Sequence, residues 1–150
     1  MRFWDTSAVV RLLVADASSA PIMREYELDP EVIAWWATEA ECVSALARLE
    51  RDDSLTAASM AEGLRRLDGL ARAWREVQPV TAVRTTAIRL LRVHPLRAAD
   101  ALQLGAAIVA AENHPASLQI VTLDERLAQA AEREGFAVVR PGPAPATSSS

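Results

Sequence analysis

The sequence predicts an α/β fold, a three-layer sandwich in which helices cover both faces of a five-stranded parallel sheet. Two observations predict it. Short apolar runs of strand length alternate along the chain with longer segments of helical periodicity. The 150 residues, of which 51% are hydrophobic, suit one domain with a sizeable core. We therefore expect one domain over residues 1–140 and a disordered tail, rich in Pro, Ala and Ser, over residues 141–150.

The expected strands and helices follow one another from the N-terminus. The first strand ends at Asp5, and the others cover residues 31–36, 77–80, 118–123 and 136–139. The helices cover residues 7–14, 20–28, 38–51, 56–74, 81–94, 96–112 and 127–134. Helix 56–74 is expected to bury one seam, formed by Met60, Leu64, Leu67, Ala71 and Trp74.

Three helix ends carry recognisable signals. Thr38 is expected to cap its helix, with Glu41 completing a capping box, and Thr81 is expected to cap another helix. Gly135 is expected to end the last helix in the left-handed conformation.

The composition limits where the protein acts. No uninterrupted apolar run approaches the roughly 18 residues that a membrane-spanning helix needs. Asp5 lies where a signal peptide would need its apolar region, so we do not expect export. The single cysteine, Cys42, permits neither an internal disulfide nor a cysteine-based zinc site. A reducing cytoplasm, with no contact to a membrane, is the expected location.

All 16 basic residues are Arg. The absence of Lys excludes a Walker A phosphate loop, a Schiff-base enzyme and the carboxylate-plus-Lys sites of receiver domains and haloacid-dehalogenase-type phosphatases. The stretch from Arg48 to Arg97 holds ten Arg and six acidic residues and so carries +4, whereas the rest of the chain carries −8. This pattern is compatible with a phosphate-binding surface around an acidic, metal-binding pocket.

Four carboxylates occupy related places in the predicted fold. Asp5 and Asp124 end strands, whereas Glu41 and Asp100 lie in the first turns of helices. Asp5 alone would be explained as a helix N-cap. Because strand C-termini and the N-termini of the following helices share one edge of such a sheet, all four can converge. Unpaired carboxylates repel one another, and a divalent cation relieves the repulsion; oxygen ligands favour Mg²⁺, which Mn²⁺ can replace.

Other side chains have two interpretations each. Thr6, Ser7 and Thr122 are placed to orient the acidic ligands, or equally to cap helices and bond strand ends. Arg65 and Arg72 form either a solvated helix face or an RNA-binding one. We read His94 and His114 as surface residues beside prolines, and Cys42 as a core residue.

Four short blocks of sequence carry a resemblance to a known family. They are residues 5–8 (DTSA), 41–48 (ECVSALAR), 94–104 (HPLRAADALQL) and 121–127 (VTLDERL). Each block alone is a weak signal, but four in order and at family-like spacing, within a match from residue 3 to about 139, are specific. The chain resembles the PIN-domain ribonucleases of the VapC toxin type.

The resemblance implies a PIN-like fold and an acidic Mg²⁺ site formed by Asp5, Glu41, Asp100 and Asp124. It also implies endonucleolytic cleavage of RNA, homodimerisation, and inhibition by a cognate antitoxin, with higher toxin–antitoxin assemblies compatible with this. The acidic, Lys-free composition is a departure, because Arg alone must then hold RNA.

The sequence is compatible with three functions. The leading one is a Mg²⁺-dependent endoribonuclease that acts as a growth-inhibiting toxin, in which metal-activated water attacks a backbone phosphorus. The second is a PIN-like module that binds protein or RNA without cleaving it, which a missing acid would favour. The third, a Mg²⁺ phosphatase, is disfavoured because Ser7 stands where the second Asp would be and no Lys exists. The sequence leaves open the RNA cut, the cleavage sequence, the number of metal ions and the identity of the antitoxin.

Overall fold

The computed structural model describes residues 1–142. Five parallel strands form one sheet in the order β3-β2-β1-β4-β5. Their bounds are β1 (Arg2–Trp4), β2 (Val32–Trp35), β3 (Arg75–Val77), β4 (Gln119–Val121) and β5 (Ala137–Val139). The predicted disordered tail, residues 141–150, lies outside the described part of the chain except for its first two residues.

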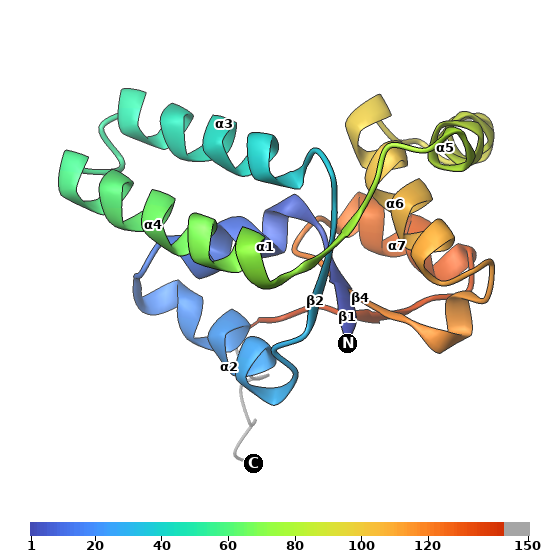
Figure 1. Ribbon diagram of the computed structural model, residues 1–150, viewed down its shortest axis with the longest axis horizontal. Coiled ribbons are helices and arrows are strands. Elements are labelled where there is room, and N and C mark those ends of the chain that lie inside the picture. Colours follow the sequence, from blue (N-terminus) through green and yellow to red (C-terminus); the bar gives the residue numbers. More distant parts are fainter. Residues whose placement is uncertain (143–150) are drawn as a thin grey trace, which may run out of the picture.

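Seven helices pack on the two faces of this sheet (Figure 1). One face carries α1 (Thr6–Leu13), α2 (Ala20–Leu28), α3 (Thr38–Arg51) and α4 (Ala57–Ala73). The other face carries α5 (Thr81–Val93), α6 (Ala98–Ala110) and α7 (Glu125–Arg133). Two short 3₁₀ turns, Ala17–Ser19 and Pro115–Ser117, precede α2 and β4. The predicted three-layer sandwich with a five-stranded parallel sheet is confirmed.

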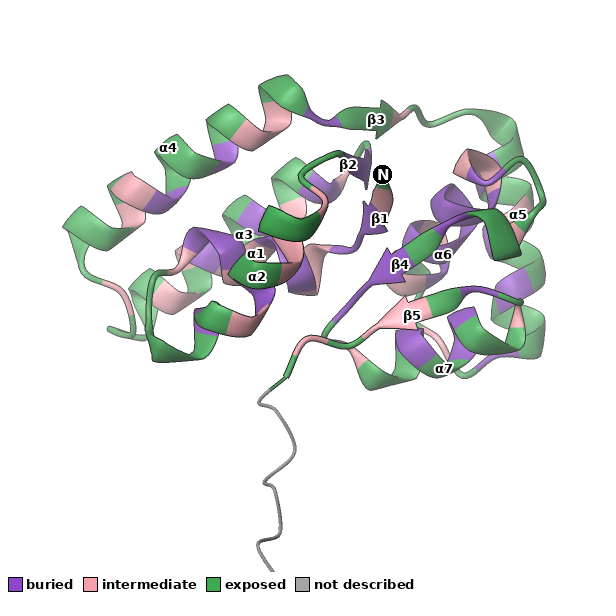
Figure 2. Cartoon of the chain, turned by 90° about the horizontal axis from the view of Figure 1, so that it is seen from below, coloured by how far each residue is buried: buried purple, intermediate pink, exposed green. Residues whose placement is uncertain are grey.

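Each face of the sheet has its own apolar core. Alternate residues of β1 divide between the two cores: Phe3 packs with α5, α6 and α7, whereas Trp4 packs with α1, α3 and α4. Strands β1 and β4 are largely buried in the middle of the sheet, and the edge strands β3 and β5 are more exposed (Figure 2). Neighbouring parallel strands buried on both faces require this apolar composition.

The chain reverses its direction of travel across the sheet between β1 and β4. From β1 it moves outward to β2 and β3, and it then crosses back to β4 and outward to β5. Trp4 pairs with Val121, and the Asp5 N–H donates to the Val121 carbonyl at 3.2 Å, so both strands end at the same level. Ligands bind to open α/β sheets at such a switch point, outside the carboxyl ends of the strands.

Three local predictions were wrong. Strand β3 covers residues 75–77 instead of 77–80, and Pro79 lies beyond it, where no ladder hydrogen bond is required of it. Ala37 and Val80, not Thr38 and Thr81, occupy the N-cap positions of α3 and α5, and neither helix has a side-chain cap. Thr38 is instead fully buried, and its hydroxyl accepts a hydrogen bond from another helix.

The seam of α4 is also only partly as predicted. Leu67 and Trp74 are buried, and Met60 and Ala71 pack against the core, but Leu64 is exposed. Gly63 lies in its place against α1 and α3: a Cβ there would be 3.4 Å from the Leu13 carbonyl. Gly135 has a φ of 103° and ends α7, as predicted.

His94 is buried, which corrects its reading as a surface residue. Its Nε2 lies 2.8 Å from Glu134 Oε2, and Arg89 donates to the other oxygen of Glu134 at 2.8 Å. These contacts join the ends of α5 and α7. His114 is exposed, as predicted. None of the helices in residues 1–142 combines the length and apolarity that crossing a membrane requires.

Gly105 allows α6 to approach α5 closely. A Cβ at this position would lie 3.0 Å from the Val83 carbonyl oxygen and 3.3 Å from the Ala87 nitrogen, both backbone atoms of α5. A Cβ at Gly69 in α4 would have no heavy atom within 4 Å, so Gly69 provides a matched control.

We predict that Gly105→Val lowers the free energy of unfolding by about 1–3 kcal/mol, because the backbone of α5 must move away. Gly69→Val should change it by less than about 0.5 kcal/mol. Urea denaturation of both variants measures the difference. Equal unfolding free energies would show that α5 moves to accommodate the added side chain at no cost in stability.

Candidate active site

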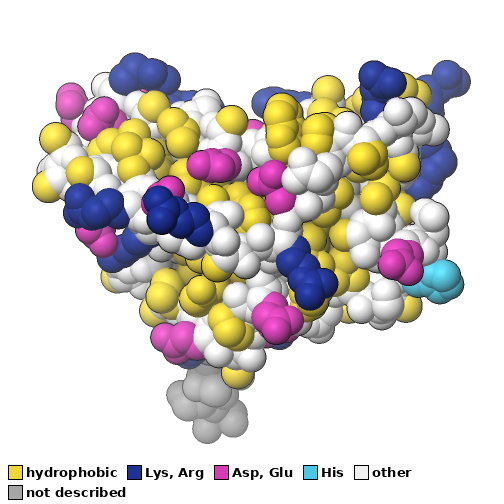
Figure 3. Space-filling view, viewed as in Figure 1, with side chains coloured by type: hydrophobic (Ala, Val, Ile, Leu, Met, Phe, Trp, Pro, Cys, Tyr) yellow, Lys and Arg dark blue, Asp and Glu magenta, His cyan; other side chains and the backbone are white. Residues whose placement is uncertain are grey.

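The four predicted carboxylates line one pocket above the β1/β4 switch point. Asp5 directly follows β1, and Asp124 is the N-cap of α7 after β4. Glu41 and Asp100 lie in the first turns of α3 and α6, on opposite faces of the sheet. The pocket measures about 420 Å³. Its lining is Asp5, Thr6, Ser7, Val10, Glu41, Ser44, Ala45, Arg48, Ala99, Asp100, Gln103 and Asp124. Figure 3 shows acidic side chains gathered where the two groups of helices meet.

Asp5 is 4% exposed and combines two roles that the sequence presented as alternatives. Its Oδ1 accepts the Ala8 N–H at 3.2 Å and so caps α1, and it also accepts the Ser7 hydroxyl at 2.8 Å. Burial raises the pKa of this carboxyl from 3.8 to about 6, and the negative charge of Asp124 adds to the rise. Hydrogen bonds from Ser7 and Thr122 oppose it. Capping the helix therefore does not remove Asp5 from the pocket.

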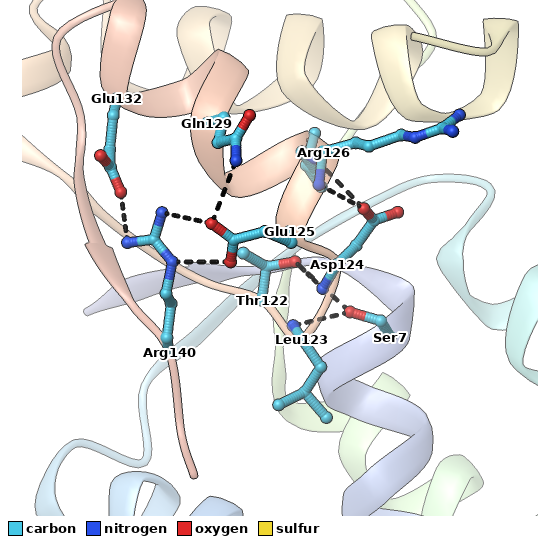
Figure 4. Close-up of polar contacts among 10 residues, drawn as sticks. Ser7, Thr122, Leu123, Asp124, Glu125, Arg126, Gln129, Glu132 and Arg140 are labelled. Carbon is cyan, nitrogen blue, oxygen red and sulfur yellow. Dashed lines mark hydrogen bonds and ion pairs between the residues drawn. The ribbon is translucent and has the colours of Figure 1, made fainter.

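Ser7 and Thr122 connect the ends of β1 and β4 (Figure 4). The Ser7 hydroxyl donates to Asp5 Oδ1 at 2.8 Å. As Figure 4 shows, it also accepts the Leu123 N–H, at 2.9 Å. Thr122 is fully buried, and its hydroxyl accepts the Asp124 N–H at 3.0 Å. Asp124 Oδ1 in turn accepts the Arg126 and Leu127 N–H groups at 2.9 and 3.2 Å. These bonds set the spacing of the two aspartates across the switch point.

Glu41 is fixed by donors from two other helices. The Thr6 hydroxyl on α1 donates to Glu41 Oε2 at 2.7 Å, and the Gln103 amide on α6 lies 3.3 Å from the same oxygen. Thr6 thus stands where the sequence placed it, beside an acidic side chain of the pocket.

Asp100 is coupled to its acidic neighbours. Partial burial raises the pKa of this carboxyl, and the charges of Asp124 and Glu41 raise it further. The backbone and charge of Arg97, the N-cap residue of α6, oppose the rise. Repulsion among these carboxylates is the property that a bound cation would relieve.

The hydrogen bonds of three acids converge on one oxygen each: Oδ1 of Asp5, Oε2 of Glu41 and Oδ1 of Asp124. The second oxygens of Glu41 and Asp124 have no hydrogen bond or ion pair within residues 1–142. The atoms that could ligate a metal ion here are carboxylate oxygens, which suit a hard divalent cation. In the described chain, however, no three His, Cys, Asp or Glu side chains are already grouped as a finished metal site.

Arg65 and Arg72, the predicted RNA-contact candidates, do not line this pocket. Both lie exposed on α4, where they form ion pairs with Glu62 and Asp68. Arg48 lines the pocket instead. Its spacing of seven residues from Glu41 puts both on one face of α3, and this spacing was the available sequence signal.

Two further residues clarify what the site can do. Cys42 is buried, as predicted, and burial with the neighbouring Glu41 raises the pKa of its thiol to about 12, so the thiol stays protonated. Gln103 is 2% exposed and reaches the acidic cluster from α6. Sequence reasoning missed it, because an amide has no charge pattern; its position three residues after Asp100 was the only signal.

The fold and the acidic pocket at the switch point define a PIN-like α/β protein. The fold matches the crystal structure of FitAcB from Neisseria gonorrhoeae with a TM-score of 0.64, at 20% identity over 94% of this chain and 98% of that one. It matches the structure of FitAB bound to an IR36 DNA fragment with a TM-score of 0.65, at 18% identity over 94% and 95%.

Sequence comparison identifies the particular relatives. Ribonuclease VapC45 and Ribonuclease VapC49, from two strains of Mycobacterium tuberculosis, are each 28% identical to this chain over 136 residues, which is 91% of this chain and 92% of theirs. No protein-family model matches the chain. The resemblance to VapC-type PIN-domain ribonucleases is confirmed by these relatives and by the fold.

The raised pKa of Asp5 predicts how metal-free stability depends on pH. Between pH 3.8 and about 6 the folded protein binds more protons at Asp5 than the unfolded chain does. The stability contributed by the protonated carboxyl is therefore complete below pH 3.8 and is lost as the pH rises through 6.

Asp5→Asn removes this titration and keeps an oxygen for the cap of α1. From pH 4 to pH 7, the wild type should lose roughly 2 kcal/mol of unfolding free energy relative to Asp5→Asn. Urea denaturation in EDTA at both pH values tests this. Parallel pH profiles for the two proteins would show that Asp5 has an ordinary pKa.

Proposed function

We propose that this protein is a metal-dependent endoribonuclease and the toxin of a toxin–antitoxin pair. The observation that carries the proposal is the meeting of four carboxylates from four elements in one pocket at the switch point. The names of the relatives, both ribonucleases, supply the reaction class. RNA is the proposed substrate, and hydrolysis of its phosphodiester bonds the proposed reaction.

Mg²⁺, replaceable by Mn²⁺, is the proposed cofactor. Asp5, Glu41, Asp100 and Asp124 would hold it, with the unbonded oxygens of Glu41 and Asp124 facing the least competition from protein donors. When bound, such a cation lowers the pKa of a coordinated water and offsets negative charge on the phosphoryl group. The charges of Asp124 and Glu41 repel the Asp100 carboxylate, and this supports the proposal because a bound cation would offset the repulsion.

The residues of the chain would then have separate tasks. Ser7 and the Ala8 N–H orient Asp5, while Thr122 and the first turn of α7 orient Asp124. Arg48, at the edge of the pocket, is placed to contact a phosphate of the RNA. Arg65 and Arg72 would extend that contact along α4, since exposed ion pairs contribute only about 0–1 kcal/mol and do not prevent it.

A cognate antitoxin and a homodimer belong to the same proposal. The relatives carry VapC names, and one structural neighbour is a FitAB complex bound to DNA. These names support an antitoxin partner, whereas the dimer stays a prediction from the resemblance.

The second candidate is a PIN-like binding module without nuclease activity. One observation favours it: the described acids do not already form a finished three-ligand group. The presence of all four acids in one pocket favours the nuclease.

We predict that the purified, antitoxin-free protein cleaves a mixed RNA pool with Mg²⁺ but not with EDTA. Asp100→Asn should reduce the rate to below about one hundredth of the wild-type rate, because it removes a cation ligand. Asp53→Asn, which changes an exposed aspartate in the turn after α3, is the matched control and should keep full activity.

Gel analysis of the RNA and circular dichroism of each variant complete this test. Cleavage that persists in EDTA or in Asp100→Asn would contradict the metal-dependent mechanism. A folded, metal-loaded protein that cleaves nothing would favour the binding module.

We predict that replacing both Arg65 and Arg72 with Ala weakens RNA binding and flattens its salt dependence. Each lost phosphate contact should reduce the slope of log K against log salt by roughly 0.7. Fluorescence anisotropy in EDTA measures binding without cleavage, and Arg24→Ala, on the exposed side of α2, is the control. An unchanged slope would assign this face of α4 to solvent or to a protein partner.

A further inference from the structure

Gln103 is a buried amide that contacts the candidate site from α6. Its Nε2 lies 2.8 Å from Thr6 Oγ1, 3.1 Å from Thr38 Oγ1 and 3.3 Å from Glu41 Oε2. The two partners other than Thr6 belong to α3, so one amide joins three helices: α1, α3 and α6. It lies one turn after Asp100 on the same helix, and it lines the same pocket.

The two shortest contacts of Gln103 determine where the Thr6 proton points. An amide nitrogen has two N–H groups, and the two threonine oxygens can accept both of them. Thr6 Oγ1 then accepts from Gln103 and donates its own proton to Glu41 Oε2 at 2.7 Å. The Thr6 hydroxyl therefore donates to Oε2, with the Gln103 nitrogen 3.3 Å from the same oxygen, whereas Glu41 Oε1 has no hydrogen bond or ion pair within the described residues.

Packing alone does not explain an amide at this position. The Gln103 Oε1 atom is buried and has no hydrogen-bond partner within residues 1–142. A buried unpaired acceptor disfavours folding, and an apolar side chain of the same length would fill the space without it. The amide is therefore explained by its hydrogen bonds, which lead through Thr6 to Glu41 in the pocket.

We propose that Gln103 is a positioning residue that acts through Thr6 on Glu41, so that Oε2 is occupied by protein donors and Oε1 stays available to a divalent cation. This inference rests on the proposed function, which it deepens by assigning the orientation of one ligand. Residues that orient metal ligands through hydrogen bonds typically change metal affinity about 10–100-fold when they are removed.

The test measures Mn²⁺ binding, not activity. Metal-free protein is titrated with Mn²⁺ and free Mn²⁺ is read by electron paramagnetic resonance. Gln103→Met keeps the length of the side chain and removes the amide, and should weaken Mn²⁺ binding about tenfold while the protein stays folded. Gln119→Met is the control, because this exposed glutamine bonds Arg2 at the opposite end of β4 and should bind Mn²⁺ as the wild type does.

A double-mutant cycle separates positioning from general support of the fold. If Gln103 acts through Glu41, Gln103→Met should cause no further loss of Mn²⁺ affinity in a Glu41→Gln background. An equal tenfold loss in both backgrounds would overturn the proposal, and so would unchanged affinity in a folded Gln103→Met protein.

Thr6→Val provides a second variant should Gln103→Met fail to fold. It removes only the relaying hydroxyl, and it should weaken Mn²⁺ binding to a similar degree; unchanged affinity would overturn the proposal. The wild type distinguishes failure of the proposed metal site from failure of the role assigned to Gln103. A folded wild type that binds no Mn²⁺ overturns the proposed metal site and this inference together, whereas a wild type that binds Mn²⁺ beside an unaffected Thr6→Val overturns the inference alone.

Discussion

Repulsion among carboxylates in one pocket is the constraint on which the arrangement of this site depends. Burial and the charge of Asp124 raise the pKa of Asp5 to about 6 against the opposing hydrogen bonds, and burial together with the charges of Asp124 and Glu41 raises the pKa of Asp100. The surrounding structure supplies hydrogen-bond donors: hydroxyls and the first N–H groups of helices bond to single oxygens of the acids. The donors restrain the acids but leave part of their negative charge uncompensated, which is the condition that favours a cation.

The sheet determines why these particular side chains meet. Because β1 and β4 are neighbours at the switch point, their C-terminal residues stand side by side, and the helices that follow them begin at the same edge. The helices α3 and α6 come from opposite layers, so Glu41 and Asp100 close the pocket from both sides. Gly105 supports this closure indirectly, since it lets α6 pack tightly against α5.

Some features of the site were predictable because they follow from local rules. An apolar strand followed by Asp and a helix places that Asp at the sheet edge wherever the strand lies in the sheet, so Asp5 and Asp124 could be found without coordinates. The capping box at Thr38 was wrong for the opposite reason. A threonine three residues before a glutamate satisfies the local pattern, but the buried amide of Gln103 is the partner that the folded chain provides.

The sequence by itself determined the layers, the parallel sheet and the four acids at its carboxyl edge, because hydrophobic periodicity and strand-end position are properties of neighbouring residues. Only the tertiary structure decided that His94 is buried against Glu134, that Arg48 rather than Arg65 or Arg72 lines the pocket, and that Gln103 reaches Glu41. The His94–Glu134 and Gln103–Glu41 contacts join residues 40 and 62 positions apart in sequence. The place of Arg48 depends on which face of α3 is turned towards the pocket. Such placements follow from how helices pack across the sheet, which local spacing restricts but does not determine.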